Sequence, residues 1–187
     1  MYYILKREQS GRFADAIFSE PGYHDAAWSE ALRRLRILQE LDSVNLPERT
    51  ASHDKKRLLG DVVFSPPFLA VNKKVQSVMA GAGVDAQFLP FSMKSIKETT
   101  TPYFYVSIVN KAHVLDLNKS IYEVSDLSQK INSVTSVHVN EGADFGPLVR
   151  CYDSKLIFVK ESLVQRFKEE GITGVEFCPI NEFSGRP

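Results

Sequence analysis

Two segments of this sequence follow the same pattern, and this repetition constrains the fold more than any other feature. The segments are residues 71–91, VNKKVQSVMAGAGVDAQFLPF, and residues 159–180, VKESLVQRFKEEGITGVEFCPI. In both, apolar residues recur at helical spacing, a glycine follows (Gly83 or Gly171), and a Phe-x-Pro segment comes next. Glycine adopts the left-handed conformation that ends many helices, and a short apolar run is typical of a strand. The pattern therefore predicts two helix–Gly–strand units.

Other apolar runs predict further strands, several of them close together along the chain. Residues 103–109 and 113–117 have the pattern of one hairpin, and residues 148–152 and 156–159 have the pattern of another. Residues 121–131 are predicted to form a short helix or to be irregular. Strands that outnumber helices and are adjacent in sequence favour the α+β class. We therefore expect an antiparallel or mixed sheet, or two such sheets, with packed helices.

The sequence divides at a polar stretch. Residues 1–57 comprise a strand at 2–5, an amphipathic helix at 26–41 and a polar loop at 42–57. Residues 58–187 contain both repeated units, and we expect them to form the core of the fold. A chain of 187 residues is long enough to bury one good core or two small ones. The repeated units are therefore expected to form one domain or two small lobes.

Composition argues against some classes of function. The chain has 23 Lys and Arg against 23 Asp and Glu, so its formal net charge is zero. A mainly electrostatic nucleic-acid binder would carry a basic excess, and a nucleic-acid mimic would carry an acidic one. No apolar run reaches the ~18–20 residues that cross a bilayer, and the start MYYILKREQ lacks the charge order of a secretory signal. We expect a cytoplasmic protein that binds neither nucleic acid nor membrane, with Cys151 and Cys178 as free thiols.

The sequence contains only weak matches to motifs of catalysis or cofactor binding. Residues 81–86, GAGVDA, match the dinucleotide pattern G-x-G-x-x-A, but they follow a predicted helix where that site requires a preceding strand. Cys151 with His113 or His138 would make a thiol–imidazole pair, yet Cys151 lies in the apolar run LVRCY, where a buried thiol is expected. The four histidines and two cysteines lack the paired spacing of a metal site. We expect no metal, no cofactor and no catalytic residue.

Four stretches carry a resemblance to a known family. They are MYYIL, GDVVFSPPFLAVNKKVQSVMAGAGVDAQFLPF, YFYVSIVNKAHVLDLNKS and LIFVKESLVQRFKEEGITGVEFCPI. Their order, with a helix that ends on glycine, a Phe-x-Pro strand, an aromatic strand and a Gly-x-Thr-Gly-Val-x-Phe ending, resembles that of the immunity proteins of bacterial polymorphic toxin systems, immunity family eleven. The match covers residues 58–180 and the first few residues. It consists of packing and turn residues, which specify a fold rather than a mechanism.

The resemblance implies a function in competition between bacteria. Proteins of that family are cytoplasmic, are encoded beside a secreted toxin such as one delivered by type VI secretion, and bind its C-terminal effector domain. We therefore expect neutralisation by stoichiometric binding and no enzymatic activity. The expected interface residues lie in polar loops, where recognition residues concentrate, and are Glu48, Lys97, Glu98, Glu141, Asp144 and Phe145. Two alternatives stay open: an enzyme that reverses a toxin's modification of its target, and a general peptide- or nucleic-acid-binding module.

Overall fold

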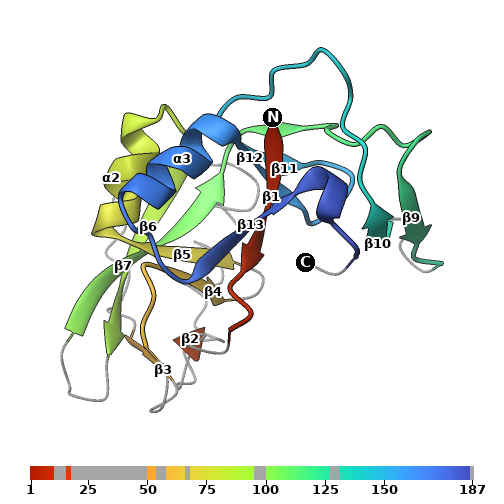
Figure 1. Cartoon of the computed structure of the whole chain (residues 1–187). Coiled ribbons are helices and arrows are strands. Elements are labelled where there is room, and N and C mark those ends of the chain that lie inside the picture. The colour runs from red at the N-terminus through yellow and green to blue at the C-terminus, as the bar shows by residue number, and fades with distance from the viewer. Residues whose placement is uncertain are drawn as a thin grey trace.

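The computed structural model describes residues 1–10, 16–17, 50–53, 58–65, 68–94, 100–126 and 131–185. The described part has the mixed α+β architecture that the sequence predicts, with open sheets and two packed α-helices (Figure 1). In chain order the elements are β1 (Tyr2–Arg7), β2 (Ala16–Ile17), β3 (Thr50–His53), β4 (Val62–Ser65), β5 (Phe68–Asn72), α2 (Lys73–Gly81), β6 (Ala86–Lys94), β7 (Thr100–Ile108), β8 (Lys111–Ala112), β9 (Ile121–Val124), β10 (Ile131–Ser136), β11 (Leu148–Cys151), β12 (Ile157–Lys160), α3 (Glu161–Glu169), β13 (Val175–Pro179) and the 3₁₀ helix η2 (Ile180–Glu182).

The described strands form three sheets. The first has the order β13-β1-β12-β11-β8 and is called the β1 sheet below. The second has the order β2-β3-β6-β7-β5-β4 and is called the β7 sheet. Strands β9 and β10 form a separate two-stranded ribbon, which extends from the side of the molecule (Figure 1). Most pairs are antiparallel, but β8 is parallel to β11 and β3 is parallel to β6, so both large sheets are mixed.

The two α-helices have the same position in the connectivity of their sheets. Helix α2 connects β5 to β6, which flank β7, and helix α3 connects β12 to β13, which flank β1. In each case the middle strand is antiparallel to both neighbours. Gly83 follows α2 with φ 70° and Gly171 follows α3 with φ 59°, so the left-handed conformation predicted at both glycines is confirmed.

The β1 sheet is buried on both faces. Because side chains alternate along a strand, Leu5 and Val159 point into a core shared with both helices and the β7 sheet, and Ile4 and Phe158 point the other way. The opposite face belongs to a second core, which includes Val134 of the ribbon. Burial of this second core holds the ribbon against the body of the protein.

The Gly-x-Thr-Gly segment after α3 fastens the two large sheets together. The Thr173 backbone N–H and hydroxyl donate to Asp61 Oδ2 at 2.9 and 2.8 Å, and the Val62 N–H donates to the Thr173 carbonyl at 3.0 Å. Asn72 Nδ2 donates to Asp61 Oδ1 at 2.6 Å. Gly174 lies against β4, where an added Cβ would be 2.2 Å from the Val62 carbonyl oxygen. Asp61 therefore connects the turn before β13 to the residue before α2.

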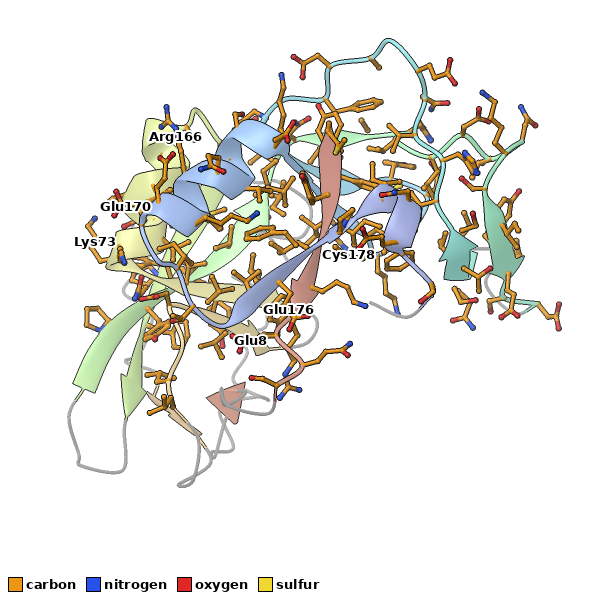
Figure 2. All side chains as sticks on the ribbon, in the orientation of Figure 1. Glu8, Lys73, Arg166, Glu170, Glu176 and Cys178 are labelled. Atoms are coloured by element: carbon orange, nitrogen blue, oxygen red, sulfur yellow. The ribbon has the colours of Figure 1, made fainter. Side chains whose placement is uncertain are left out.

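Helices α2 and α3 are adjacent, and each supplies a cation to the C-terminal end of the other. The Arg166 guanidinium donates to the Gly81 carbonyl at 2.8 Å, and the Lys74 ammonium donates to the Glu170 carbonyl. Figure 2 shows Arg166 and Glu170 on the side of α3 toward α2. The carbonyls at a helix C-terminus carry partial negative charge, so both contacts stabilise the helix pair.

Two local predictions are wrong. Strand β7 pairs with β5 and β6, and after Ile108 the chain crosses to the β1 sheet, so residues 103–109 and 113–117 do not form a hairpin. Residues 121–124 form a strand and are neither helical nor irregular, because pairing with β10 decides their conformation. The second predicted hairpin is confirmed by the antiparallel pairing of β11 with β12.

The N-terminal part of the chain is described only in pieces. The helix predicted at residues 26–41 lies outside the described residues. Strand β1 lies between β12 and β13, so the first residues belong to the same sheet as the last strands. The domain boundary at residue 57 stays a prediction. Among the described helices, none combines the length and the apolar character that crossing a membrane requires.

Candidate binding groove

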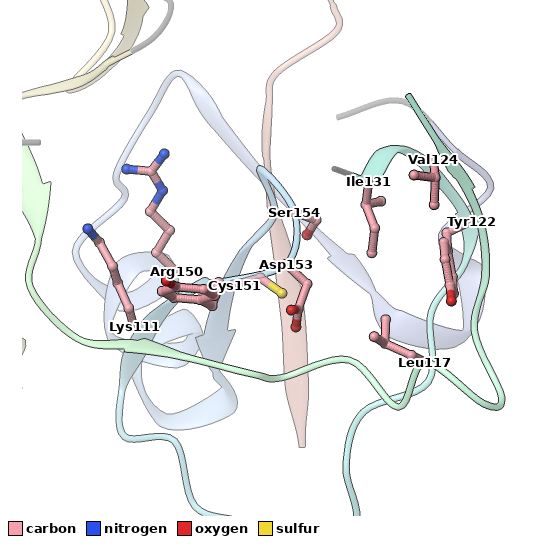
Figure 3. Close-up of a pocket in the computed structure, with 10 residues that line it drawn as sticks. Lys111, Leu117, Tyr122, Val124, Ile131, Arg150, Cys151, Asp153 and Ser154 are labelled. Carbon is pink, nitrogen blue, oxygen red and sulfur yellow. The ribbon is translucent and has the colours of Figure 1, made fainter. Parts of the chain in front are cut away.

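A cavity of about 530 Å³ opens between the β1 sheet and the β9–β10 ribbon. One wall is the β8–β11 edge of the sheet with the turn that follows β11, and the other wall is the ribbon (Figure 3). We call this cavity the groove. The side chains that line it are Lys111, Leu117, Tyr122, Val124, Ile131, Arg150, Cys151, Tyr152, Asp153 and Ser154.

The groove has a cationic end. Lys111 and Arg150 lie together in Figure 3, and they are paired residues in the parallel register of β8 and β11. Burial lowers the pKa of Lys111, and the positive charge of Arg150 lowers the pKa further. Two cations therefore meet at this end of the groove, close enough for their charges to interact.

The opposite end of the groove is apolar. Leu117, Tyr122, Val124 and Ile131 line it (Figure 3). Leu117 and Val124 remain 39% and 46% exposed. Ile121, the first residue of β9, is 63% exposed but does not line the groove. Contiguous exposed apolar side chains mark interaction surfaces more often than scattered ones. The ribbon is therefore the part of the described surface that favours contact with another molecule.

A histidine–aspartate pair lies beside the groove. His113 Nδ1 is 2.8 and 3.0 Å from the two carboxylate oxygens of Asp153, and the His113 ring lies 4.9 Å from the exposed ring of Tyr152. Cys151 is only 2% exposed, so its thiol belongs to the core as the sequence predicts. The partner of His113 is therefore Asp153 and not the thiol, and the pair fixes the turn after β11 against β8.

Hydrogen bonds hold the base of the ribbon in place. The Ser120 hydroxyl donates to the His138 carbonyl at 3.1 Å and accepts from the His138 N–H at 3.0 Å. Asn140 Nδ2 donates to the carbonyls of His113 and Leu115 at 2.8 and 3.2 Å. These contacts tie the ribbon to the chain that leads from β8. They therefore fix the position of the ribbon wall of the groove relative to the sheet wall.

A second cavity, of about 600 Å³, lies between α2 and α3. Its cations are Lys74 and Arg166, which donate to the carbonyls at the helix ends. Because these cations stabilise the helix pair, the β9–β10 groove is the better candidate for a binding site. Within the described ranges, no group of three or more His, Cys, Asp or Glu is placed to hold a metal ion.

Three of the six predicted interface residues are described. Glu48, Lys97 and Glu98 lie outside the described residues. Glu141 is exposed and binds Lys119 at 3.1 Å, next to the turn that leads into the ribbon. Phe145 is half-buried, with its ring centroid 6.0 Å from that of Tyr2 and its N–H donating to the Tyr2 hydroxyl at 2.8 Å.

Asp144, the third described residue of the predicted interface, anchors its own loop. Its carboxylate accepts from Lys160 Nζ at 2.6 Å, from the Gly146 N–H at 2.9 Å and from the Tyr2 hydroxyl at 3.0 Å. The hydrogen bond from Lys160 is the largest cause that lowers the pKa of Asp144, to about 2. Asp144 and Phe145 therefore share Tyr2 as a partner, and Glu141 faces a different neighbour. The role of these residues in an interface stays a prediction.

The lowered pKa of Asp144 predicts a pH dependence. A carboxyl group with a depressed folded-state pKa contributes stability above its unfolded pKa and loses it as the pH falls through the folded pKa. We expect wild type to melt at a higher temperature than Asp144→Asn above pH 3.8, the ordinary pKa, and the difference to disappear as the pH falls to about 2. Asp85→Asn, at an exposed position after α2, controls for the loss of a carboxylate. An equal difference at every pH would contradict the expectation.

None of the residues that line the groove is among the six interface residues predicted from the sequence. Lys111, Arg150 and Tyr152 lie in runs that read as strand and turn, and the apolar residues of the ribbon look like core residues. Neither a protein-family model nor a curated protein matches the sequence. The resemblance to immunity family eleven therefore stays a prediction.

Proposed function

We propose that this protein acts in the cytoplasm and neutralises a secreted toxin by stoichiometric binding to the toxin's C-terminal effector domain. The observation that carries the binding role is the groove, with exposed apolar side chains on the ribbon beside charged and aromatic groups. Among the residues that line the groove, Leu117, Val124 and Tyr152 are 39%, 46% and 69% exposed. Apolar and aromatic residues surrounded by polar ones are typical of a surface that binds another protein. The resemblance to the immunity proteins supplies the class of partner.

One observation favours the enzymatic alternative. An imidazole held by a carboxylate at the side of a groove is an arrangement that general bases use, and His113 with Asp153 has it. An enzyme that reverses a toxin's modification is therefore the second candidate function. The two candidates differ in stoichiometry, because an inhibitor is used up by binding and an enzyme turns over.

A titration separates these two functions. The protein is mixed at increasing molar ratio with the effector domain encoded by the neighbouring gene, and the toxin's activity is measured. We expect inhibition to rise linearly and to be complete at equimolar protein, because each inhibitor molecule occupies one toxin molecule. His113→Gln is expected to inhibit as wild type does, since the imidazole has no chemical step to perform.

Two outcomes would count against neutralisation by binding. Full protection at far below equimolar protein, lost in His113→Gln, would favour the enzyme. The absence of any complex at micromolar concentrations would reject the toxin as the partner and leave the general peptide- or nucleic-acid-binding module.

We also propose that the two helix–Gly–strand units are structural copies, each the centre of one lobe. In this proposal β1, between β12 and β13, corresponds to β7, between β5 and β6. In support, β4 pairs with β5 as β11 pairs with β12. The Asn72 N–H donates to the Asp61 carbonyl at 2.9 Å, and the Lys160 N–H donates in the same way to the Pro147 carbonyl at 2.9 Å. Superposition of the two backbones is the direct check.

A further inference from the structure

We infer that the groove binds an acidic and apolar peptide segment of the partner protein, with a carboxylate at Lys111 and Arg150 and apolar side chains on the ribbon. This inference rests on the proposed function and adds the chemistry of the partner's contact segment. It names a site that the sequence did not indicate.

The charge of the groove selects a carboxylate. Like charges at paired positions of neighbouring strands repel each other and weaken the sheet, and Lys111 and Arg150 are such a pair. A carboxylate beside them is attracted by both cations, and a guanidinium binds it with two parallel hydrogen bonds. In the described part of the chain, none of the ion pairs involves Arg150. The guanidinium is therefore placed to bind an acid that another molecule supplies.

The apolar wall of the groove selects apolar side chains next to that carboxylate in the bound peptide. Leu117 and Val124 are partly exposed there, and Tyr122 and Ile131 stand beside them (Figure 3). Covering these side chains with apolar groups removes their surface from water, which is favourable. Asp153 lies between the two ends and repels a second carboxylate at its own position. The order of groups is thereby fixed, with the acid at the Lys111 end and the apolar side chains at the ribbon.

The composition of the apolar wall favours a peptide over a nucleic acid. Proteins that bind single strands stack bases on aromatic rings and carry a continuous basic track. Here the apolar wall is mostly aliphatic, through Leu117, Val124 and Ile131, and the whole chain has a formal net charge of zero. Aliphatic side chains beside a pair of cations therefore fit an acidic and apolar peptide segment better than they fit a nucleic acid.

The test uses the full chain and defined probes in a fluorescence anisotropy titration. The first probe is a fluorescein-labelled peptide DELFDLIE, the second is its basic counterpart KKLFKLIK, and the third is a labelled single-stranded oligonucleotide. We expect the acidic peptide to bind and the other two to bind more weakly. Arg150→Glu is expected to weaken binding of the acidic peptide about tenfold or more, because it places a negative charge where the carboxylate lies.

Matched variants separate recognition from misfolding. Lys168→Glu makes a charge reversal of the same kind at an exposed position of α3, outside the groove, and should bind the acidic peptide as wild type does. Val124→Ser, on the exposed ribbon, removes apolar surface without adding a charge and should weaken binding independently of Arg150. Thermal melting of each variant tests whether the fold is kept.

The outcomes also separate this inference from the proposed function. Equal binding of the acidic and basic peptides, preference for the oligonucleotide, or unchanged binding by Arg150→Glu would overturn the inference. If in addition Arg150→Glu still neutralises the toxin at equimolar protein, the proposed function stands and the groove is not its site. Binding of the acidic peptide without any neutralisation supports the chemistry of the groove and rejects the toxin as its source.

Discussion

Gly174→Ala is expected to lower the free energy of unfolding by ~3 kcal/mol or more, because it combines backbone strain with a steric clash. Gly174 has φ 84°, a conformation that alanine adopts only with strain. Its new Cβ would also be 2.2 Å from the Val62 carbonyl oxygen. That oxygen has little room to move, since Val62 is paired with Val71 in β5 and its N–H is bonded to Thr173.

The same segment of the chain provides a matched control for the glycine prediction. Gly171 also has positive φ, at 59°, but an added Cβ there meets no atom within 4 Å. Gly171→Ala is therefore expected to cost only the strain of the left-handed conformation, ~1 kcal/mol. Urea denaturation of the two variants measures both costs. Equal costs would show that the contact between Gly174 and β4 does not constrain the fold.

This pair of glycines shows which features of the fold the sequence predicts. Gly171 was recognised because its role is local: a helix ends at that point and needs a residue that tolerates positive φ. The requirement for glycine at 174 comes from β4, which is distant in sequence. The hydrogen bonds between Asp61 and Thr173 join residues that are 112 positions apart. The residue pattern within either segment does not predict these bonds.

The hairpin predictions divide in the same way. Strands β11 and β12 are joined by a short turn, and their pairing follows from local sequence. The chain after β7 has a similar pattern but changes sheet at Asn110, whose side-chain amide donates to the carbonyls of Phe145 and Leu148 at 2.6 and 3.1 Å. Those acceptors belong to the loop before β11 and to β11 itself, so the decisive contacts are long-range.

The candidate site was harder to predict than the fold. The groove combines residues near Lys111, along the ribbon and near Arg150, and only the tertiary fold brings these three segments together. Ile121 and Val124 are apolar and strand-like, and their exposure cannot be read from the sequence. The residues chosen from polar loops instead include Asp144 and Phe145, which the structure ties to Tyr2.

Asp61→Ala is expected to lower the free energy of unfolding by ~2 kcal/mol, because it removes the acceptor of several hydrogen bonds at once. The Thr173 N–H, the Thr173 hydroxyl and the Asn72 amide all donate to the Asp61 carboxylate. The Asn72 bond is partly buried, so losing its acceptor costs more than the bond itself contributed, whereas water can replace the acceptor of the two exposed Thr173 bonds. Asp85→Ala, at an exposed position, controls for the loss of a carboxylate and is expected to change stability little.

A double-mutant cycle tests whether Asp61 acts through Thr173. We expect Asp61→Ala and Thr173→Val together to cost less than the sum of the two single changes, with a coupling of about 1 kcal/mol, because residues in one hydrogen-bond network are not independent. Additive costs would contradict a direct link between the turn before β13 and β4. A measured coupling would assign the Gly-x-Thr-Gly segment a structural role, since Asp61 and Thr173 are bonded to each other and lie outside the groove. The family resemblance of that segment would then reflect how the two sheets are joined and not which partner the protein binds.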